Sequence, residues 1–404
     1  MRIRIRIIFV IFAVLFETFF FSACQQTVKQ SLNDCLAFDK TISPLDDLSF
    51  IQPDTNTSTL STYESDIAVE KEYIDYLYSG GEFELPINGA SGYASVSLNI
   101  YEDTSIDSAV LGSLISGQAF EILNEFGEWW QINTDTVTGW VMRKYCFINL
   151  PDIIPSIIYN IDNASASEMK SSGKDIPNIT GKKLYDAYSY NQRLGREEYI
   201  VPVLYPMALK ICAAQQAALA EGNTIIIYEG FRPYDVQQLV VSGLNQLAAA
   251  DADVNAGINT PPWSMGWFMA RGVSNHQKGY AIDAGLGKVI NKVTAITGDY
   301  IYSHIESYQE YEMPTNIHEL SSASVIFENP IISSSDTEWR KAILSDKINE
   351  PALLLQKYCT EAGMTPLASE WWHFNDLESA EITKQSLNTG NYYLYDVKSQ
   401  IPVS

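Results

Sequence analysis

Five short β-rich runs separated by turn residues occupy residues 93–148 and set the first limit on the fold. They cover residues 96–100, 110–114, 119–123, 129–132 and 138–141. Strands of this length and regular spacing are typical of a small barrel, in which each strand buries one face against the others. We therefore expect residues 81–150 to form a small all-β domain.

The rest of the chain, residues 151–404, has the mixed pattern of one α+β domain. Apolar residues at helical spacing predict helices over 208–221, 235–250 and 351–362, and Gly222 and Gly363 follow the first and the last of them. The run from Thr224 to Tyr228 predicts a buried strand. The chain is thus expected to be multidomain, with an all-β domain followed by an α+β domain.

The first two dozen residues resemble an export signal rather than part of a fold. Arginines at positions 2, 4 and 6 precede an apolar run over 7–16, and small residues lead into Cys24. The cysteine after Ser-Ala resembles a bacterial lipobox, so we expect a lipoprotein signal peptide over 1–23 and lipidation of Cys24. The alternative is an uncleaved signal anchor, because Glu17 interrupts the apolar stretch. Both interpretations place the rest of the chain outside the cytoplasm, and the first anchors it to the membrane by lipid alone.

Residues 24–80 are rich in Ser, Thr, Asp and Asn and are expected to form a polar stalk. The whole chain has 26 basic and 49 acidic residues, a net charge of −23. Such a surface repels nucleic acid and anionic lipid headgroups, so neither is expected as a partner. Cys212 and Cys359 lie in apolar helical patterns and are expected to be buried free thiols.

Two of the four histidines stand in dense polar and aromatic contexts. One segment runs Ser274-Asn275-His276-Gln277-Lys278-Gly279-Tyr280-Ala281-Ile282-Asp283, and the other Glu370-Trp371-Trp372-His373. Hydrolytic zinc sites use three nitrogen or oxygen ligands and leave a fourth position to water. His276, Asp283 and His373 supply such a set, and Gly279 permits the reversal that returns Asp283 towards His276.

Glu370 and Arg232 are the candidates for proton transfer and for binding negative charge on the substrate. A carboxylate beside a zinc site can take a proton from water, which fits Glu370. Residues at i and i+3 of a flat strand point to opposite sides, so a bend at the two tryptophans is required if Glu370 and His373 share a strand. Arg232 follows the expected buried strand and can donate to an oxyanion or a substrate carboxylate.

These segments together resemble the bacterial zinc D-Ala-D-Ala peptidases, in particular D-alanyl-D-alanine dipeptidases of the VanX type. The Ser-x-His-x6-Asp element matches Ser274, His276 and Asp283. Two further elements, Glu-x-Trp-His and aromatic-Arg-Pro, match Glu370 to His373 and Phe231 to Pro233. The resemblance implies an antiparallel sheet with flanking helices and one zinc ion held by His276, Asp283 and His373. It also implies that Glu370 is the general base, that Arg232 stabilises the tetrahedral intermediate, and that Ser274 shapes the substrate pocket.

Residues 93–148 resemble bacterial SH3-like domains, which often bind cell-wall peptides. This domain either binds the wall or only spaces and orients the enzyme, and its tryptophans do not decide between these roles. One departure from the peptidase family stands at His318, where an Asp is common. We expect His318 and His304 to be structural or surface residues without a role in the site.

Three functions are consistent with these patterns. The first is hydrolysis of free D-Ala-D-Ala, which the motifs favour. The second is a carboxypeptidase that trims D-Ala from peptidoglycan stem peptides, which are the substrates available outside the membrane. The third is a wall-binding lipoprotein with an inactive peptidase domain, and retention of all the site residues argues against it.

Overall fold

The computed structural model describes residues 71–384 and 391–404, which form one compact unit. The expected signal peptide, Cys24 and most of the expected stalk lie outside the described residues. Within the described part of the chain, no helix is long and apolar enough to cross a lipid bilayer.

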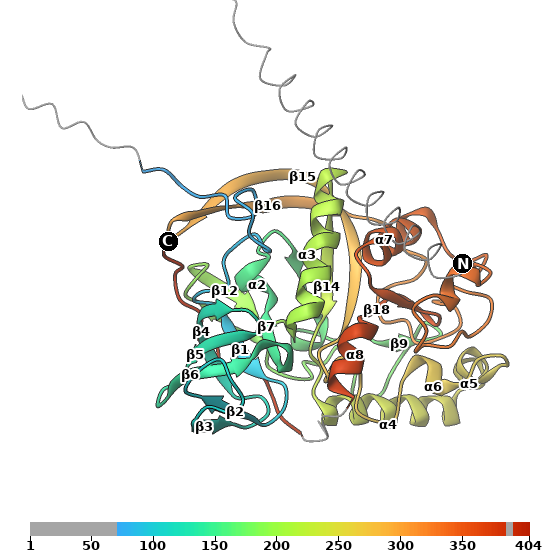
Figure 1. Cartoon of the computed structure of the whole chain (residues 1–404). Coiled ribbons are helices and arrows are strands. Elements are labelled where there is room, and N and C mark those ends of the chain that lie inside the picture. The colour runs from blue at the N-terminus through green and yellow to red at the C-terminus, as the bar shows by residue number, and fades with distance from the viewer. Residues whose placement is uncertain (1–70, 385–390) are drawn as a thin grey trace, which may run out of the picture. The chain divides into compact units, whose positions relative to one another are not determined.

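The all-β domain is a strongly bent sheet of seven of its own strands (Figure 1). They are β1 (Ser91–Ala94), β2 (Leu98–Tyr101), β3 (Val110–Leu114), β4 (Ala119–Phe126), β5 (Trp129–Asn133), β6 (Thr138–Met142) and β7 (Cys146–Asn149). Together they are called the barrel below. The fully buried Trp130 ring belongs to its core, and its Nε1 donates to Glu125 at 2.7 Å. This tryptophan is therefore a packing residue rather than part of a ligand surface.

The larger domain is built on a second sheet with strand order β17-β18-β15-β14-β8, and β16 pairs with β15 outside this order. Its strands are β8 (Ile158–Tyr159), β14 (Asn223–Glu229), β15 (Ala281–Thr297), β16 (Tyr300–Glu310), β17 (Thr365–Leu367) and β18 (Glu370–Asn375). Every pair in it is antiparallel except β8 with β14. The structure thus confirms the expected layout of a strand-rich SH3-like region followed by a mixed domain with flanking helices.

Helices surround this sheet, and α3 lies against β14 (Figure 1). The helices are α2 (Leu150–Ile153), α3 (Tyr205–Ala220), α4 (Tyr234–Ala250), α5 (Ala252–Asn259), α6 (Met265–Phe268), α7 (Glu350–Glu361) and α8 (Leu377–Thr383). Short two-stranded ladders complete the domain: β9 (Lys170–Ser171) with β10 (Lys174–Asp175), and β11 (Tyr188–Asn191) with β12 (Arg196–Tyr199). The three helices and the buried strand predicted from periodicity are all present, and no predicted end differs from the observed end by more than three residues.

The two domains are joined through backbone and core. Strand β13 (Pro202–Leu204) belongs to the larger domain, yet it pairs with β7 and completes the barrel sheet as its eighth strand. The Phe147 ring from β7 packs at 6.0 Å between ring centroids on Phe231, next to Arg232. The amide N of Leu204 donates to the carbonyl of Gly279 at 2.8 Å. The barrel therefore supports the loop that carries His276.

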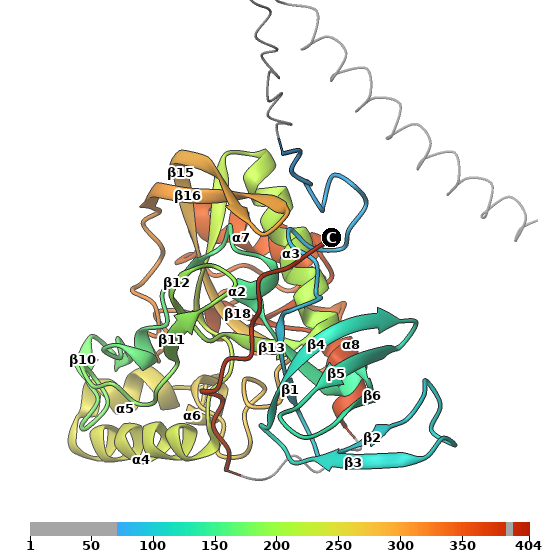
Figure 2. The same ribbon diagram turned by 90° about the vertical axis from the view of Figure 1, so that its left-hand side faces the viewer.

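Residues 391–404 form a C-terminal tail that runs along the boundary between the barrel and the larger domain (Figure 2). At its start, Tyr392 lies on Phe231 with ring centroids 5.3 Å apart. Further on, Ser399 Oγ donates to the buried carboxylate of Asp152 at 2.6 Å, and the amide of Gln400 donates to Gly89 O at 2.7 Å. Two side chains of β1 also contact the tail, Tyr93 through Asp396 O at 2.7 Å and Ser91 through Ser399 Oγ at 3.1 Å, so the tail links the barrel to the segment just past β14.

Candidate metal centre and active site

The larger sheet brings the predicted site residues into one neighbourhood. Strand β15 lies between β14 and β18, and Asp283 of β15 is paired with Glu229 on one side and His373 on the other. Arg232 lies three residues beyond Glu229, just past the end of β14. His276 comes from the loop before β15. Residues far apart in sequence therefore meet at one end of three adjacent strands.

The loop that carries His276 is a tight turn fixed by its own hydrogen bonds. Ser274 Oγ accepts from Gln277 N at 3.1 Å, and Gly279 N donates to the carbonyl of His276 at 3.0 Å. Gly279 has φ +76°, a conformation that side chains disfavour. This confirms the predicted reversal between His276 and Asp283.

Strand β18 is irregular where the sequence required a bend. Pro366 of β17 is paired with Phe374, but its neighbour Leu367 is paired with Glu370. Residues 371–373 of β18 therefore have no partner in β17. This bulge interrupts the regular alternation of side chains between the two faces of the strand. As a result, Glu370 Oε2 lies 3.7 Å from His373 Nδ1, and the two side chains share one face.

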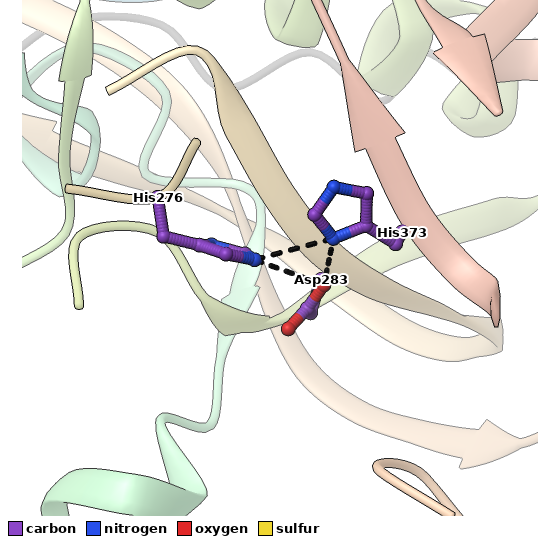
Figure 3. A group of neighbouring side chains, drawn as sticks. All are labelled: His276, Asp283 and His373. Carbon is purple, nitrogen blue, oxygen red and sulfur yellow. Dashed lines mark hydrogen bonds and ion pairs between the residues drawn. The ribbon is translucent and has the colours of Figure 1, made fainter. Parts of the chain in front are cut away.

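Three ligand atoms converge at the centre of the site (Figure 3). His373 Nδ1 lies 2.9 Å from Asp283 Oδ1 and 3.2 Å from His276 Nε2, and the remaining edge, from His276 Nε2 to Asp283 Oδ1, is 3.4 Å. All three side chains are buried. The donor atoms of a tetrahedral zinc with bonds of about 2.0–2.2 Å are roughly 3.3–3.6 Å apart, so the triangle is close to what zinc requires.

The outer hydrogen bonds of both imidazoles direct lone pairs into this triangle. His276 Nδ1 is 2.9 Å from the carbonyl of Gly230, which can only accept, so Nδ1 carries the proton and Nε2 does not. His373 Nε2 donates to Asn375 Oδ1 at 3.1 Å, and Asn275 Nδ2 donates to the same oxygen at 2.8 Å. The two inward ring nitrogens are therefore free to bind a cation. Burial lowers the pKa of His276, which favours this neutral form.

Asp283 remains an anion in this environment. Burial opposes its charge, but the surrounding histidines, among them His318 at Oδ2, outweigh that effect and hold the pKa of Asp283 well below its usual range. Two imidazoles and one carboxylate form the nitrogen-and-oxygen donor set of catalytic zinc sites, so the residues fit the ion that the sequence predicts.

Glu370 lies beside the triangle without belonging to it. Its side chain is buried, and burial raises the pKa of Glu370 to about 7. A general base works best when its pKa is close to the working pH, because it is then both ionised and basic enough to take a proton. Glu370 thus lies where a base would be needed, next to the three candidate metal ligands.

Arg232 is held rigidly in the wall of the site. Its Nε donates to Glu229 Oε2 at 2.7 Å, its Nη1 to Gln237 Oε1 at 2.8 Å, and its Nη2 to Glu229 and, at 3.3 Å, to Asp283 Oδ2. Burial works against the guanidinium charge, but Glu229 and Asp283 outweigh it and raise the pKa of Arg232. These bonds leave one Nη1 hydrogen for a ligand.

A second group of possible ligands, Glu229, Asp283 and His318, lies next to the first. Glu229 already accepts from Arg232, from Asn163 Nδ2 at 2.7 Å and from Tyr185 OH at 3.0 Å. A carboxylate paired with a guanidinium and two further donors has little affinity left for a metal ion. His276, Asp283 and His373 are therefore the better candidate for a metal centre.

His318 belongs to the site, contrary to the sequence interpretation that gave it no role there. Its ring is buried, with Nε2 3.0 Å from Asp283 Oδ2 and Nδ1 2.9 Å from Asp162 Oδ2. Burial disfavours its charged form, but Asp162 and Asp283 outweigh burial and raise the pKa of His318 well above its usual value. His304, in contrast, is partly exposed near Arg196, as expected for a residue outside the site. The one sequence signal for His318 was its position where the family commonly has a carboxylate.

A cavity of about 390 Å³ opens at the metal centre, within the roughly 300–1,000 Å³ of ligand pockets. Arg232, Ser274 and all the predicted metal and base residues line it, together with apolar side chains that include Trp267 and Trp372. Ser264, Gly266, Ala270 and Ser333 are exposed and form its rim. Among the described residues that line it, the acidic side chains are Asp283 and Glu370 alone.

Comparisons with known proteins agree with this arrangement. A family model described as bacterial SH3 domain matches residues 96–146. A second, described as D-ala-D-ala dipeptidase, matches residues 176–391, which is just over half of the chain. A search of curated proteins found no significant match.

Proposed function

Because the chain belongs to the D-ala-D-ala dipeptidase family, we propose that it is a zinc-dependent hydrolase of peptides that end in D-Ala-D-Ala. The observation that carries this proposal is the convergence of His276 Nε2, Asp283 Oδ1 and His373 Nδ1 beside Glu370 in one cavity. Zinc held there would lower the pKa of water and polarise the peptide carbonyl. The family is one of metallopeptidases, and this donor set suits zinc better than magnesium or calcium, which prefer oxygen ligands.

In this proposal the chain's own residues have separate roles. Glu370 takes the proton from the attacking water and passes it to the leaving amine. Arg232 uses its remaining Nη1 hydrogen to stabilise negative charge on the former carbonyl oxygen. Ser274 fixes the loop of His276 and lines the pocket. The two tryptophans of the cavity wall exclude bulk water, which strengthens these charge interactions.

The direct test measures zinc content and D-Ala release with residues 25–404. We expect one zinc per chain and hydrolysis of D-Ala-D-Ala. Glu370→Gln should keep the metal and lose about 10²–10⁴-fold in kcat, because the general base is gone. His276→Ala should lose both metal and turnover. Wild-type turnover by Glu370→Gln would show that the base is another group.

The substrate is either free D-Ala-D-Ala, which the family description favours, or a longer stem peptide. One observation favours the longer peptide. A free dipeptide carries an ammonium that needs a counter-charge, but both cavity carboxylates, Asp283 and Glu370, are assigned to the metal centre and the base. A stem peptide has an amide at that position and needs no such partner.

D-Ala-D-Ala and its N-acetyl derivative differ only at this group, so their kcat/KM ratio decides between the two substrates. A dipeptidase prefers the free amine, whereas a carboxypeptidase prefers the acetylated form and a stem pentapeptide. If neither is hydrolysed by zinc-loaded protein, the third function, an inactive wall-binding protein, gains support.

We also propose that the chain is exported and held at the membrane by a lipid on Cys24. The support is the charged, apolar and small-residue order of residues 1–24. Expressed in a bacterium, the wild-type chain should be found in the membrane fraction, and Cys24→Ser should lose the lipid label. The SH3-like domain is proposed to contribute to wall binding, and a pull-down with purified peptidoglycan tests this.

A further inference from the structure

We propose that His318 is a positioning residue that holds Asp283 so that only its Oδ1 faces the metal ion. This inference rests on the proposed zinc function. It starts from the unequal surroundings of the two Asp283 oxygens. Oδ1 faces the ring nitrogens of His276 and His373, whereas Oδ2 faces His318 Nε2 at 3.0 Å and Arg232 Nη2 at 3.3 Å.

His318 is the closer of the two donors to Oδ2, and it makes fewer hydrogen bonds to other residues than Arg232 does. Arg232 directs its shorter bonds to Glu229 and Gln237. A donor on Oδ2 opposes rotation of the carboxylate and its binding of the metal through both oxygens. With one oxygen occupied in this way, Asp283 gives the metal a single ligand atom, and a coordination position remains open for water and substrate.

The surroundings of His318 fix its ring independently of Asp283. On its far side, Nδ1 is held by Asp162, and the ring meets Trp372 edge to face with centroids 5.9 Å apart. The backbone at His318 has φ +57°, which is unfavourable for residues other than glycine. Lys170 N donates to the His318 carbonyl at 3.1 Å and helps to hold this conformation. Such strain is maintained only where the surrounding structure imposes it.

Two amide variants separate the role of each ring nitrogen. The amide of Gln in His318→Gln reaches the place of Nε2 and can still donate to Asp283. The shorter amide of His318→Asn reaches the place of Nδ1 and can still pair with Asp162. Asn tolerates positive φ better than Gln does, so His318→Asn should be the more stable protein. The positioning role predicts the opposite order for zinc affinity.

The experiment measures zinc dissociation constants of the folded chain by competition with a chromophoric chelator, together with the visible spectrum of the cobalt(II)-loaded protein. We expect His318→Gln to stay close to wild type in both readouts. We expect His318→Asn and His318→Ala to bind zinc about 10–100-fold more weakly, the usual effect of losing an outer-shell partner, with an altered cobalt spectrum.

The outcomes distinguish this inference from the proposed function. Equal zinc affinity in the Gln and Asn variants, or affinity that follows their stability, overturns the positioning role. A wild-type chain that binds no zinc overturns both proposals. Zinc binding with the expected order of variants, but no hydrolysis of any D-Ala-D-Ala peptide, supports the positioning role and overturns the proposed reaction.

Discussion

Replacing Gly279 with alanine tests whether the barrel supports the metal centre. Gly279 stands between His276 and Asp283 in the sequence, and its backbone is left-handed at φ +76°. A Cβ atom placed there would lie 2.6 Å from Phe147 Cδ1 and 3.2 Å from Leu204 N, both in strands of the barrel sheet. Neither the ring, packed on Phe231, nor the strand backbone can move freely.

The expected loss of stability has two parts. The left-handed conformation costs about 1–2 kcal/mol for a residue with a side chain. Overpacking against the Phe147 ring adds about 1–3 kcal/mol. Gly181 supplies the control, because it has φ +72° and no atom within 4 Å of its added Cβ. Gly181→Ala should therefore show only the first part.

The assay is urea denaturation of both variants, combined with zinc titration. Gly279→Ala should be less stable than Gly181→Ala by about 1–3 kcal/mol and should bind zinc more weakly, because the loop of His276 must shift. In a Phe147→Ala background, Gly279→Ala should cost less than it does in the wild type by about that same difference, because the overlapping ring is gone. If the two glycine variants were equally stable and bound zinc equally, the barrel would not support the loop.

Three further outcomes are expected. Burial raises the pKa of Glu84 to about 7, above its unfolded value, so the folded state binds the extra proton and stability is lost as pH rises through the range from about 4.5 to 7. Between about pH 5 and pH 8 the wild type should lose about 3 kcal/mol relative to Glu84→Gln in urea denaturation, and a pH-independent difference would contradict this. Arg232→Lys should retain zinc but lose about 10²–10³-fold in kcat/KM, since an ammonium cannot make the paired bonds of a guanidinium, and unchanged kinetics would exclude Arg232 from the reaction. Chelation should abolish turnover, and zinc but not magnesium should restore it in the wild type, which an activity assay on dialysed protein measures.

The sequence allowed much of the metal centre to be predicted because its signals are local. His276 and Asp283 lie in one short segment with a glycine between them. Glu370 and His373 lie in another, and the bend required between them is the bulge of β18. The helices were predicted because their apolar residues recur over three or more turns.

His318 and the junction of the domains depend on contacts between distant residues. His318 meets Asp162, which lies 156 positions away, and no spacing rule connects them. Strand β13 has only three residues, too few to show an alternating pattern. In β1, the sequence Ser-Gly-Tyr-Ala lacks the β-branched residues that mark a strand, and its burial comes from neighbours on both sides.

The contacts of the C-terminal tail predict how truncated forms of the protein would behave. Its residues link the barrel to the segment just past β14, because Ser399 Oγ lies 3.1 Å from Ser91 Oγ of β1 and Tyr392 packs on Phe231. A premature stop codon just before residue 391 would preserve all the candidate metal ligands and the candidate base. It would nevertheless remove the contacts of the tail, so the shortened protein should lose thermal stability before it loses activity.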